Sequence, residues 1–412
     1  METRSDMVIK NALIVDSKGE READIEIKDG KIAKIGTDLS SDEIYDAKGC
    51  SVLPGIVELN AKTCDDRVSV DSLAKLAKNS AKGGVTTVLL NPHLNPKIDD
   101  EIILEFVKSQ NELNSKSDIK PMITAIKGEE NEQLSEIAIL LKKGAAAIYT
   151  SSDIDSSLMR RVFEYAVMYE IPLHCRAQNC SLRAGGVMHE GEVSSELGLG
   201  GIPELEENIE VAKIVEFLNR YRIETVFKSL SSARSVELVN EAKKRGFKAY
   251  AEVSIHHLVK SDEACRGYNT CAKIDPPLRD RENRELLLQM LKNGQIDFLT
   301  SLHSPKSMVQ KDIAFDEAAY GVDAISLYLP IAYTYLVKSG ILNMSDLTKL
   351  LCKNPAKVLG LNHGTIEEGC SADIVIFDPD KKRVVENEES LYYKEELFGE
   401  VTATFKEGRR IF

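Results

Sequence analysis

Eight short runs rich in β-branched and other apolar residues alternate with helical stretches between residues 51 and 301, and this alternation constrains the fold most. The runs cover residues 51–60, 85–91, 120–126, 145–150, 171–176, 224–229, 247–253 and 296–301. Amphipathic stretches lie between them, including 69–83, 132–144 and 232–246, and all three end at Gly, as capped helices often do. Strands alternating with helices favour parallel pairing, and eight such units predict an α/β fold with a (β/α)8 TIM barrel.

The two ends of the chain show a different pattern. Residues 1–50 alternate apolar and polar side chains, and an Asp-Gly pair at 29–30 is typical of a hairpin turn. Strand-like runs return at 372–379 and 401–412. We therefore predict two domains: a barrel domain of residues 51–361, and a composite β-sandwich domain formed by residues 1–50 and 362–412.

Composition excludes several classes of function. The chain has 53 Lys and Arg against 66 Asp and Glu, a net charge of −13, which disfavours nucleic acid and anionic lipid as partners. The apolar tract 324–337 is too short to span a bilayer and predicts a buried helix. A charged start without a secretory signal indicates the cytoplasm, where eight cysteines without a C-x-x-C pair are expected to be free thiols.

Reactive groups of a TIM barrel lie at the carboxyl ends of its strands, so the candidate site can be located from the runs. The residues at these ends are Asn60, Lys62, His93, Thr150 to Asp153, Arg176, Ser229, Leu302 and His303. A catalytic zinc site needs three or more His, Asp, Glu or Cys ligands that converge with one position open. These strand ends supply mainly cations, an amide and a leucine, so we expect no bound metal and no cofactor.

A collinear series of motifs covers nearly the whole chain and resembles a known family. The series includes LPGIVELN, SAKGGVTTV, LRAGGVMHEGEVS, YAEVSIHHL, YNTCAKIDPPLR, KNPAKVLGL and SADIVIFDP. It is similar to the dihydroorotases, which are cyclic amidohydrolases of the amidohydrolase superfamily. The resemblance implies a barrel that holds zinc and hydrolyses a cyclic amide.

The positions that the resemblance assigns to metal and to catalysis are replaced. Asn60 and Lys62 stand where the family has its His-x-His, Arg176 and Ser229 stand at two further histidine positions, and Leu302 stands at the catalytic aspartate. Because a leucine cannot accept a proton from an attacking water, the general base is missing. We therefore interpret these five as degenerate catalytic positions.

The resemblance also implies changes around the substrate. Cys64 falls at a family arginine, His93 at a family asparagine, and Lys306 at the last histidine. After the fourth strand, Thr150 or Ser151 replaces the family aspartate, with Asp153 as the alternative. One hypothesis is that the site holds a small anion, for example a pyrimidine precursor, and its candidate binding residues are Lys62, Cys64, His93, Arg176, Cys271 and Lys306.

Three further alternatives remain open. Asp153, His174 and His303 form the only candidate set for a rebuilt metal site, although strand alternation predicts that His303 faces away. Lys62 is a candidate for a Schiff base. The Gly-rich acidic segment 182–207 is either a structural crossover or a contact surface.

The sequence favours a non-catalytic dihydroorotase-like protein of pyrimidine biosynthesis. By family resemblance, we expect a structural or regulatory subunit that assembles with aspartate transcarbamoylase. We also expect that the chain forms a homo-oligomer, either in place of this complex or within it. The alternatives are a divergent amidohydrolase that cleaves a cyclic amide and a sensor of an anion.

Overall fold

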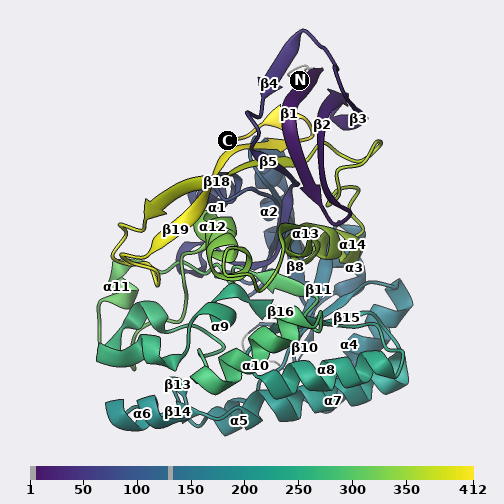
Figure 1. Ribbon diagram of the computed structural model, residues 1–412. Helices are drawn as coiled ribbons and strands as arrows, with labels where there is room; N and C mark the ends of the chain where they lie inside the picture. The colour runs from purple at the N-terminus through teal and green to yellow at the C-terminus, as the bar shows by residue number, and fades with distance from the viewer. Residues whose placement is uncertain (1–5, 129–132) are drawn as a thin grey trace.

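The computed structural model describes residues 6–128 and 133–412 and contains the predicted barrel (Figure 1). Eight strands pair in chain order, each parallel to the next. They are β6 (Ile56–Ala61), β7 (Val85–Leu90), β8 (Asp118–Thr124), β11 (Ala147–Ser151), β12 (Leu173–Arg176), β15 (Thr225–Leu230), β16 (Ala249–Ser254) and β17 (Phe298–Thr300). Side chains connect the first strand to the last, because Glu58 accepts hydrogen bonds from the Ser301 amide at 2.7 Å and from the Thr300 hydroxyl.

Helices cover the outside of the barrel, which explains why strands such as β6, β7 and β15 are buried along their whole length. The outer helices are α1 (Val70–Lys82), α2 (Glu101–Leu113), α3 (Ile137–Lys142), α4 (Ser156–Tyr169), α7 (Leu205–Tyr221), α8 (Ala233–Lys244) and α10 (Arg281–Lys292). Ser69 caps α1 by accepting a hydrogen bond from the Ser72 amide. The predicted helix 132–144 is shorter in the structure, since α3 begins at Ile137, and Glu132 lies outside the described residues.

Both ends of the chain form one sheet beside the barrel, where the sequence predicts a β-sandwich built from both ends (Figure 1). Its strands are β1 (Met7–Asp16), β2 (Gly19–Lys28), β3 (Lys31–Gly36), β4 (Glu43–Asp46), β5 (Ser51–Pro54), β18 (Ile374–Val384), β19 (Glu396–Lys406) and β20 (Arg409–Arg410). The sheet has its own core, in which Ile9, Ile25, Ile374 and Phe405 are buried. The predicted run 51–60 is therefore divided, because β5 pairs with β1 and β18 in this sheet and only β6 enters the barrel.

The Asp-Gly hairpin is confirmed. Lys28 pairs with Lys31 across the turn, and Asp29 and Gly30 both have positive φ, at 50° and 76°. A two-residue turn of this kind needs positive φ at both positions, which Gly adopts without strain.

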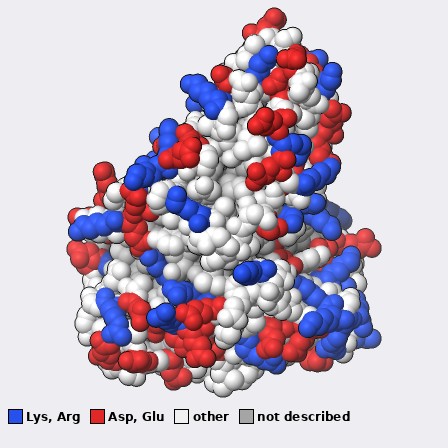
Figure 2. All heavy atoms as spheres, viewed as in Figure 1, with Lys and Arg blue, Asp and Glu red and all other residues white. Residues whose placement is uncertain are grey.

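The remaining elements connect and close the barrel. The apolar tract 324–337 is helical and mostly buried, with α12 (Tyr328–Ala332) followed by a π-helical turn, Tyr333–Val337. No helix within the described residues is long and apolar enough to cross a membrane. The shorter pieces are β9 (Ile126–Lys127), β10 (Gln133–Leu134), α5 (Cys180–Arg183), β13 (Met188–His189), α6 (Glu192–Leu197), β14 (Gly201–Ile202), α9 (Ile255–Val259), α11 (Met308–Lys311), α13 (Met344–Thr348) and α14 (Asn354–Val358). Figure 2 shows acidic and basic side chains interspersed over the face in view.

Candidate functional site

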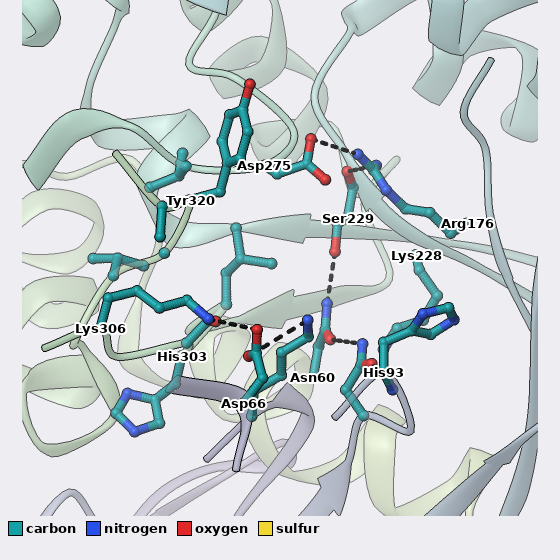
Figure 3. Close-up of a pocket in the computed structure, with 18 of the residues that line it drawn as sticks. Asn60, Asp66, His93, Arg176, Lys228, Ser229, Asp275, His303, Lys306 and Tyr320 are labelled. Carbon is teal, nitrogen blue, oxygen red and sulfur yellow. Dashed lines mark hydrogen bonds and ion pairs between the residues drawn. The ribbon is translucent and has the colours of Figure 1, made fainter. Parts of the chain in front are cut away.

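A cavity of about 510 Å³ opens at the carboxyl ends of the barrel strands, where the sequence predicts the site. Figure 3 shows the arrangement of its lining. The lining includes the predicted residues Asn60, Lys62, His93, Arg176, Ser229, Leu302, His303 and Lys306. The fold therefore brings together side chains from β6, β12 and β15 and from the segments that follow β6, β7 and β17.

The floor of the cavity is a closed hydrogen-bond network. The Asn60 amide nitrogen donates to the Ser229 hydroxyl at 2.6 Å and to Glu252 at 3.3 Å, while its oxygen accepts from Asn91 at 3.0 Å. The Ser229 amide also donates to Glu252, at 3.2 Å. The polar groups of Asn60 are thus engaged by protein partners (Figure 3).

A buried ion pair lies within this floor. The Lys228 ammonium is 2.7 Å from the Glu252 carboxylate and donates to the Leu59 carbonyl at 2.6 Å. The side chains of Lys228 and Glu252 are 1% and 0% exposed, so neither charge is solvated by bulk water. Because an unpaired charge at this depth would be very costly, each depends on the other. We call Asn60, Lys228, Ser229 and Glu252 the floor network.

One wall of the cavity contains two lysines that share a carboxylate. Lys306 is 2.6 Å from Asp66 Oδ2, whereas Lys62 is 3.6 Å from Asp66 Oδ1, too far for a hydrogen bond. Burial lowers the pKa of Lys62. The Asp66 carboxylate acts to raise this pKa, and the Lys306 charge acts to lower it further. We call Lys62, Asp66 and Lys306 the lysine wall.

A second wall contains Arg176 and Asp275, and Arg183 pairs with the same carboxylate from outside the lining. Asp275 Oδ1 is 2.7 Å from Arg183 and 3.5 Å from Arg176, and Arg176 also donates to the Ser229 carbonyl at 3.2 Å. Burial acts to raise the pKa of Asp275, but the charges of Arg176 and Arg183 outweigh burial and lower this pKa to about 2. Burial acts to lower the pKa of Arg176, but the Asp275 carboxylate outweighs burial, so the pKa of Arg176 is raised. We call Arg176, Arg183 and Asp275 the arginine wall.

Several predicted candidates do not line the cavity. Cys64 and Cys271 are absent from its lining, and the Cys271 thiol instead contacts the Glu388 carbonyl at 3.8 Å. None of the three candidates at the end of the fourth strand, Thr150, Ser151 and Asp153, lines the cavity. Tyr149 of the same strand does line it. The predicted set of six binding residues is therefore reduced to Lys62, His93, Arg176 and Lys306.

The three candidates for a rebuilt metal site are not assembled. His174 is fully buried with neither ring nitrogen hydrogen-bonded, and burial followed by the Lys228 charge lowers its pKa well below the usual value. His303 Nδ1 accepts hydrogen bonds from the Ala324 and Ile325 amides instead of facing a partner ligand. Within residues 6–128 and 133–412, no group of three or more His, Cys, Asp and Glu is placed to hold a metal ion.

The residues present do not fit the zinc that the family resemblance implies. The amide of Asn60 and the hydroxyl of Ser229 are neutral and hydrogen-bonded to each other, while Lys62 and Arg176 are basic side chains beside carboxylates. Zinc in proteins is held by thiolate, imidazole and carboxylate ligands, and cations beside it would repel it.

Sequence reasoning missed the carboxylates and the buried lysine. Asp66 follows Lys62 by four residues, and Asp275 lies within the motif YNTCAKIDPPLR. Their pairing with Lys306, Arg176 and Arg183 joins positions far apart in the chain, which no local pattern signals.

The fold and this cavity define a member of the amidohydrolase superfamily, and comparisons with known proteins agree. Residues 65–411 match the amidohydrolase family, and residues 1–49 match the N-terminal domain of the urease alpha-subunit. The dihydroorotase of Acetivibrio thermocellus is 36% identical over 387 residues, covering 92% of this chain and 91% of that protein. The dihydroorotase of Caldanaerobacter subterraneus is 33% identical over 418 residues, covering 98% and 96%. The chain therefore belongs to the amidohydrolase family, as a dihydroorotase-like member.

Solved structures support the same fold. The L-hydantoinase of Arthrobacter aurescens superposes with a TM-score of 0.88, covering 98% of this chain and 95% of that one at 22% identity. A D-hydantoinase from a Thermus species gives a TM-score of 0.85, with coverage of 98% and 94% at 22% identity. At this level of identity the likeness concerns the fold alone.

Proposed function

We propose that this chain is a non-catalytic dihydroorotase-like protein of pyrimidine biosynthesis that binds no metal. The observation that carries the proposal is the floor network. Asn60 and Ser229, at two positions where the family resemblance expects histidine ligands, are hydrogen-bonded to each other at 2.6 Å and to Glu252. The nearby Lys228 ammonium lies 2.7 Å from this carboxylate and pairs with it. The network is thus compensated without a metal ion.

The position of the general base supports the same proposal. Leu302 lines the cavity where the resemblance expects an aspartate, and its side chain cannot accept a proton. Asp275 is a carboxylate of the same lining, but its two arginine partners outweigh burial and lower its pKa to about 2. A carboxylate with so low a pKa is a poor general base near neutral pH.

A divergent amidohydrolase is the second candidate, because relatives at 30 to 36% identity carry the name dihydroorotase. Such an enzyme would need a catalytic base other than Leu302. The experiment is to assay ring opening of dihydroorotate and ring closure of carbamoyl aspartate with and without added zinc, and to measure metal content by mass spectrometry. The Acetivibrio thermocellus dihydroorotase, assayed in parallel, is the matched control.

We expect no turnover with or without zinc, and metal well below one equivalent per chain. Turnover that disappears on chelation, together with stoichiometric metal, would establish the enzyme and refute the non-catalytic proposal. A structural zinc without turnover would refute only the metal-free part.

We further propose a structural or regulatory role in a complex with aspartate transcarbamoylase. Its support is family resemblance, and a chain that retains a complete barrel while losing the base can still present an assembly surface. The test is light scattering of this chain, of the same organism's transcarbamoylase, and of their mixture. We expect a new species of higher mass, whereas unchanged masses for both would contradict the partnership and leave a homo-oligomer or monomer.

A further inference from the structure

The amino end of the barrel, opposite the cavity, carries a concentration of basic side chains. Three segments lead into β15, β16 and β17, and residues 353–357 lie beside them. The three segments are residues 220–224, 243–248 and 292–297. Together the four segments contain nine Lys and Arg but only two Asp and Glu, although the whole chain has a net charge of −13. The rest of the chain is therefore more acidic still.

Contacts between the segments hold them together at this end of the barrel. The Thr225 amide, directly after the first segment, donates to the Lys248 carbonyl at 2.9 Å. Lys243 is 2.5 Å from the Asp297 carboxylate, and the side-chain amide of Asn354 donates to the Asp297 carbonyl at 2.9 Å. Figure 1 shows α7 and α8, which end at the first two segments, side by side. We call the four segments the basic end.

Two guanidinium groups of the basic end stack on one aromatic ring. Cζ of Arg222 lies 4.5 Å from the centre of the Phe247 ring, and Cζ of Arg245 lies 4.8 Å from it. Phe247 is buried, whereas both arginines are exposed. Within residues 6–128 and 133–412, neither arginine side chain forms an ion pair or a hydrogen bond. Stacking therefore orients both cations while their N–H donors have no partner in the described part of the chain.

Helix dipoles explain part of this charge. Lys244 lies in the last turn of α8 and Lys292 in the last turn of α10, where a cation is favourable. A dipole does not require guanidinium groups from two helices to meet on one ring, as those of Arg222 and Arg245 do. It also does not explain Lys248, which lies beyond the turn that follows α8.

We propose that the basic end binds an acidic segment of a partner protein, with Arg222 and Arg245 contacting its carboxylates. The planar fork of a guanidinium matches a carboxylate and forms charge-assisted hydrogen bonds with it. Two such groups on one ring can contact neighbouring carboxylates of the same segment. At physiological salt, charges beyond about 8 Å are screened, so a short acidic segment is attracted by the basic end more than it is repelled by the acidic remainder.

The structure favours a protein segment over other anionic partners. None of the large apolar side chains exposed in the described part of the chain belongs to the basic end, so it has no group to insert into a membrane. Phe247 is 6% exposed and cannot stack on a base, and the acidic remainder of the chain repels a long nucleic acid. This inference goes beyond the proposed function, because it holds for any protein that carries such a segment.

Fluorescence anisotropy of a labelled oligoglutamate peptide, titrated with the full chain, tests the proposal. We expect binding at about 0.05 M salt that weakens tenfold or more at about 0.5 M, because salt screens exposed charges. An oligoglutamine peptide of the same length should not bind. Failure of oligoglutamate to bind at the lower salt concentration would overturn the proposal. Tighter binding of duplex DNA or of anionic phospholipid vesicles at the same salt would assign the basic end to another partner and overturn it too.

Paired variants locate the contact. Arg222→Gln with Arg245→Gln removes two exposed cations, so the fold should be retained, and we expect oligoglutamate to bind about tenfold or more weakly. Lys31→Gln with Lys34→Gln is the matched control, because it removes two exposed cations from β3 and changes the net charge equally. This control should bind as the parent does. Equal weakening in both double variants would show that net charge explains binding, and unchanged affinity in the arginine variant would place the peptide elsewhere; either result would refute the proposal.

Discussion

The floor network and the two walls of the cavity both contain charged side chains, but they balance charge in different ways. In the floor, Lys228 and Glu252 pair at 2.7 Å, and both side chains are at most 1% exposed. In the lysine wall, Lys62 and Asp66 are 26% and 30% exposed and 3.6 Å apart. The floor thus matches each charge with a partner, whereas the wall leaves a cation weakly paired.

Burial explains this difference. A charge shielded from water must be compensated within the protein, since its desolvation otherwise costs several kcal/mol. Lys62 and Asp66 keep part of their hydration, so their incomplete pairing costs little. The floor pair is therefore expected to contribute more to folding than the contact between Lys62 and Asp66.

The largest effect should follow from breaking the floor pair. Lys228→Met leaves the Glu252 carboxylate buried without its cation, and we expect a loss of about 3 to 5 kcal/mol in the free energy of unfolding. Chemical denaturation monitored by circular dichroism measures it.

The double variant Lys228→Met with Glu252→Gln is the control, because it removes both charges together. It should recover a substantial part of the loss, since a neutral buried amide is less costly than an unpaired carboxylate. A loss below about 1 kcal/mol in the single variant would show that the floor charge is not structurally important.

A smaller effect is expected in the arginine wall. Asp275→Asn leaves Arg176 and Arg183 without their shared carboxylate, and we expect a loss of about 1 to 2 kcal/mol at neutral pH. The pKa of Asp275 in the folded protein is about 2, below its unfolded value of about 4, so ionised Asp275 stabilises the fold above pH 4.

This contribution disappears as the pH falls from about 4 to about 2, where the folded protein also takes up the proton. The difference in stability between the parent and Asp275→Asn should therefore be constant at neutral pH and shrink over that range. Denaturation curves at several pH values measure it, and a difference that persists unchanged at pH 2 would contradict the ion-pair explanation.

The sequence predicted the barrel and the part of the cavity lining that lies at the strand ends for a simple reason. Strand ends of a closed barrel meet at one rim, so Asn60, Arg176 and Ser229 could be placed together from the runs alone. Lys228 was missed because alternation along a regular strand directs it away from Ser229. The structure breaks that rule, since Ser229 has a φ of 51° and the pairing of β15 with β16 shifts register between Phe227 and Leu230.

The same limit of strand alternation explains why other residues of the site were not predicted. Leu302 also has a positive φ, at 48°, and its neighbour His303 lines the cavity beside it although strict alternation predicts opposite faces. Asp66 and Asp275 lie outside the strands, where no periodic pattern fixes direction. Local backbone irregularity and loop conformation therefore set the direction of these side chains, which the periodicity of the sequence could not predict.

The smallest effect should come from the lysine wall, where the substitution made in the floor can be repeated. Lys62→Met removes a cation whose one ion pair within the described residues is the 3.6 Å contact with Asp66. We expect a change within about 0.5 kcal/mol of zero by chemical denaturation, because partly exposed pairs contribute little. Lys306→Met, which loses the 2.6 Å contact between a buried lysine and the partly exposed Asp66, should fall between Lys62→Met and Lys228→Met at about 1 to 2 kcal/mol. If all three lysine variants lost the same stability, burial would not be what separates the floor from the walls.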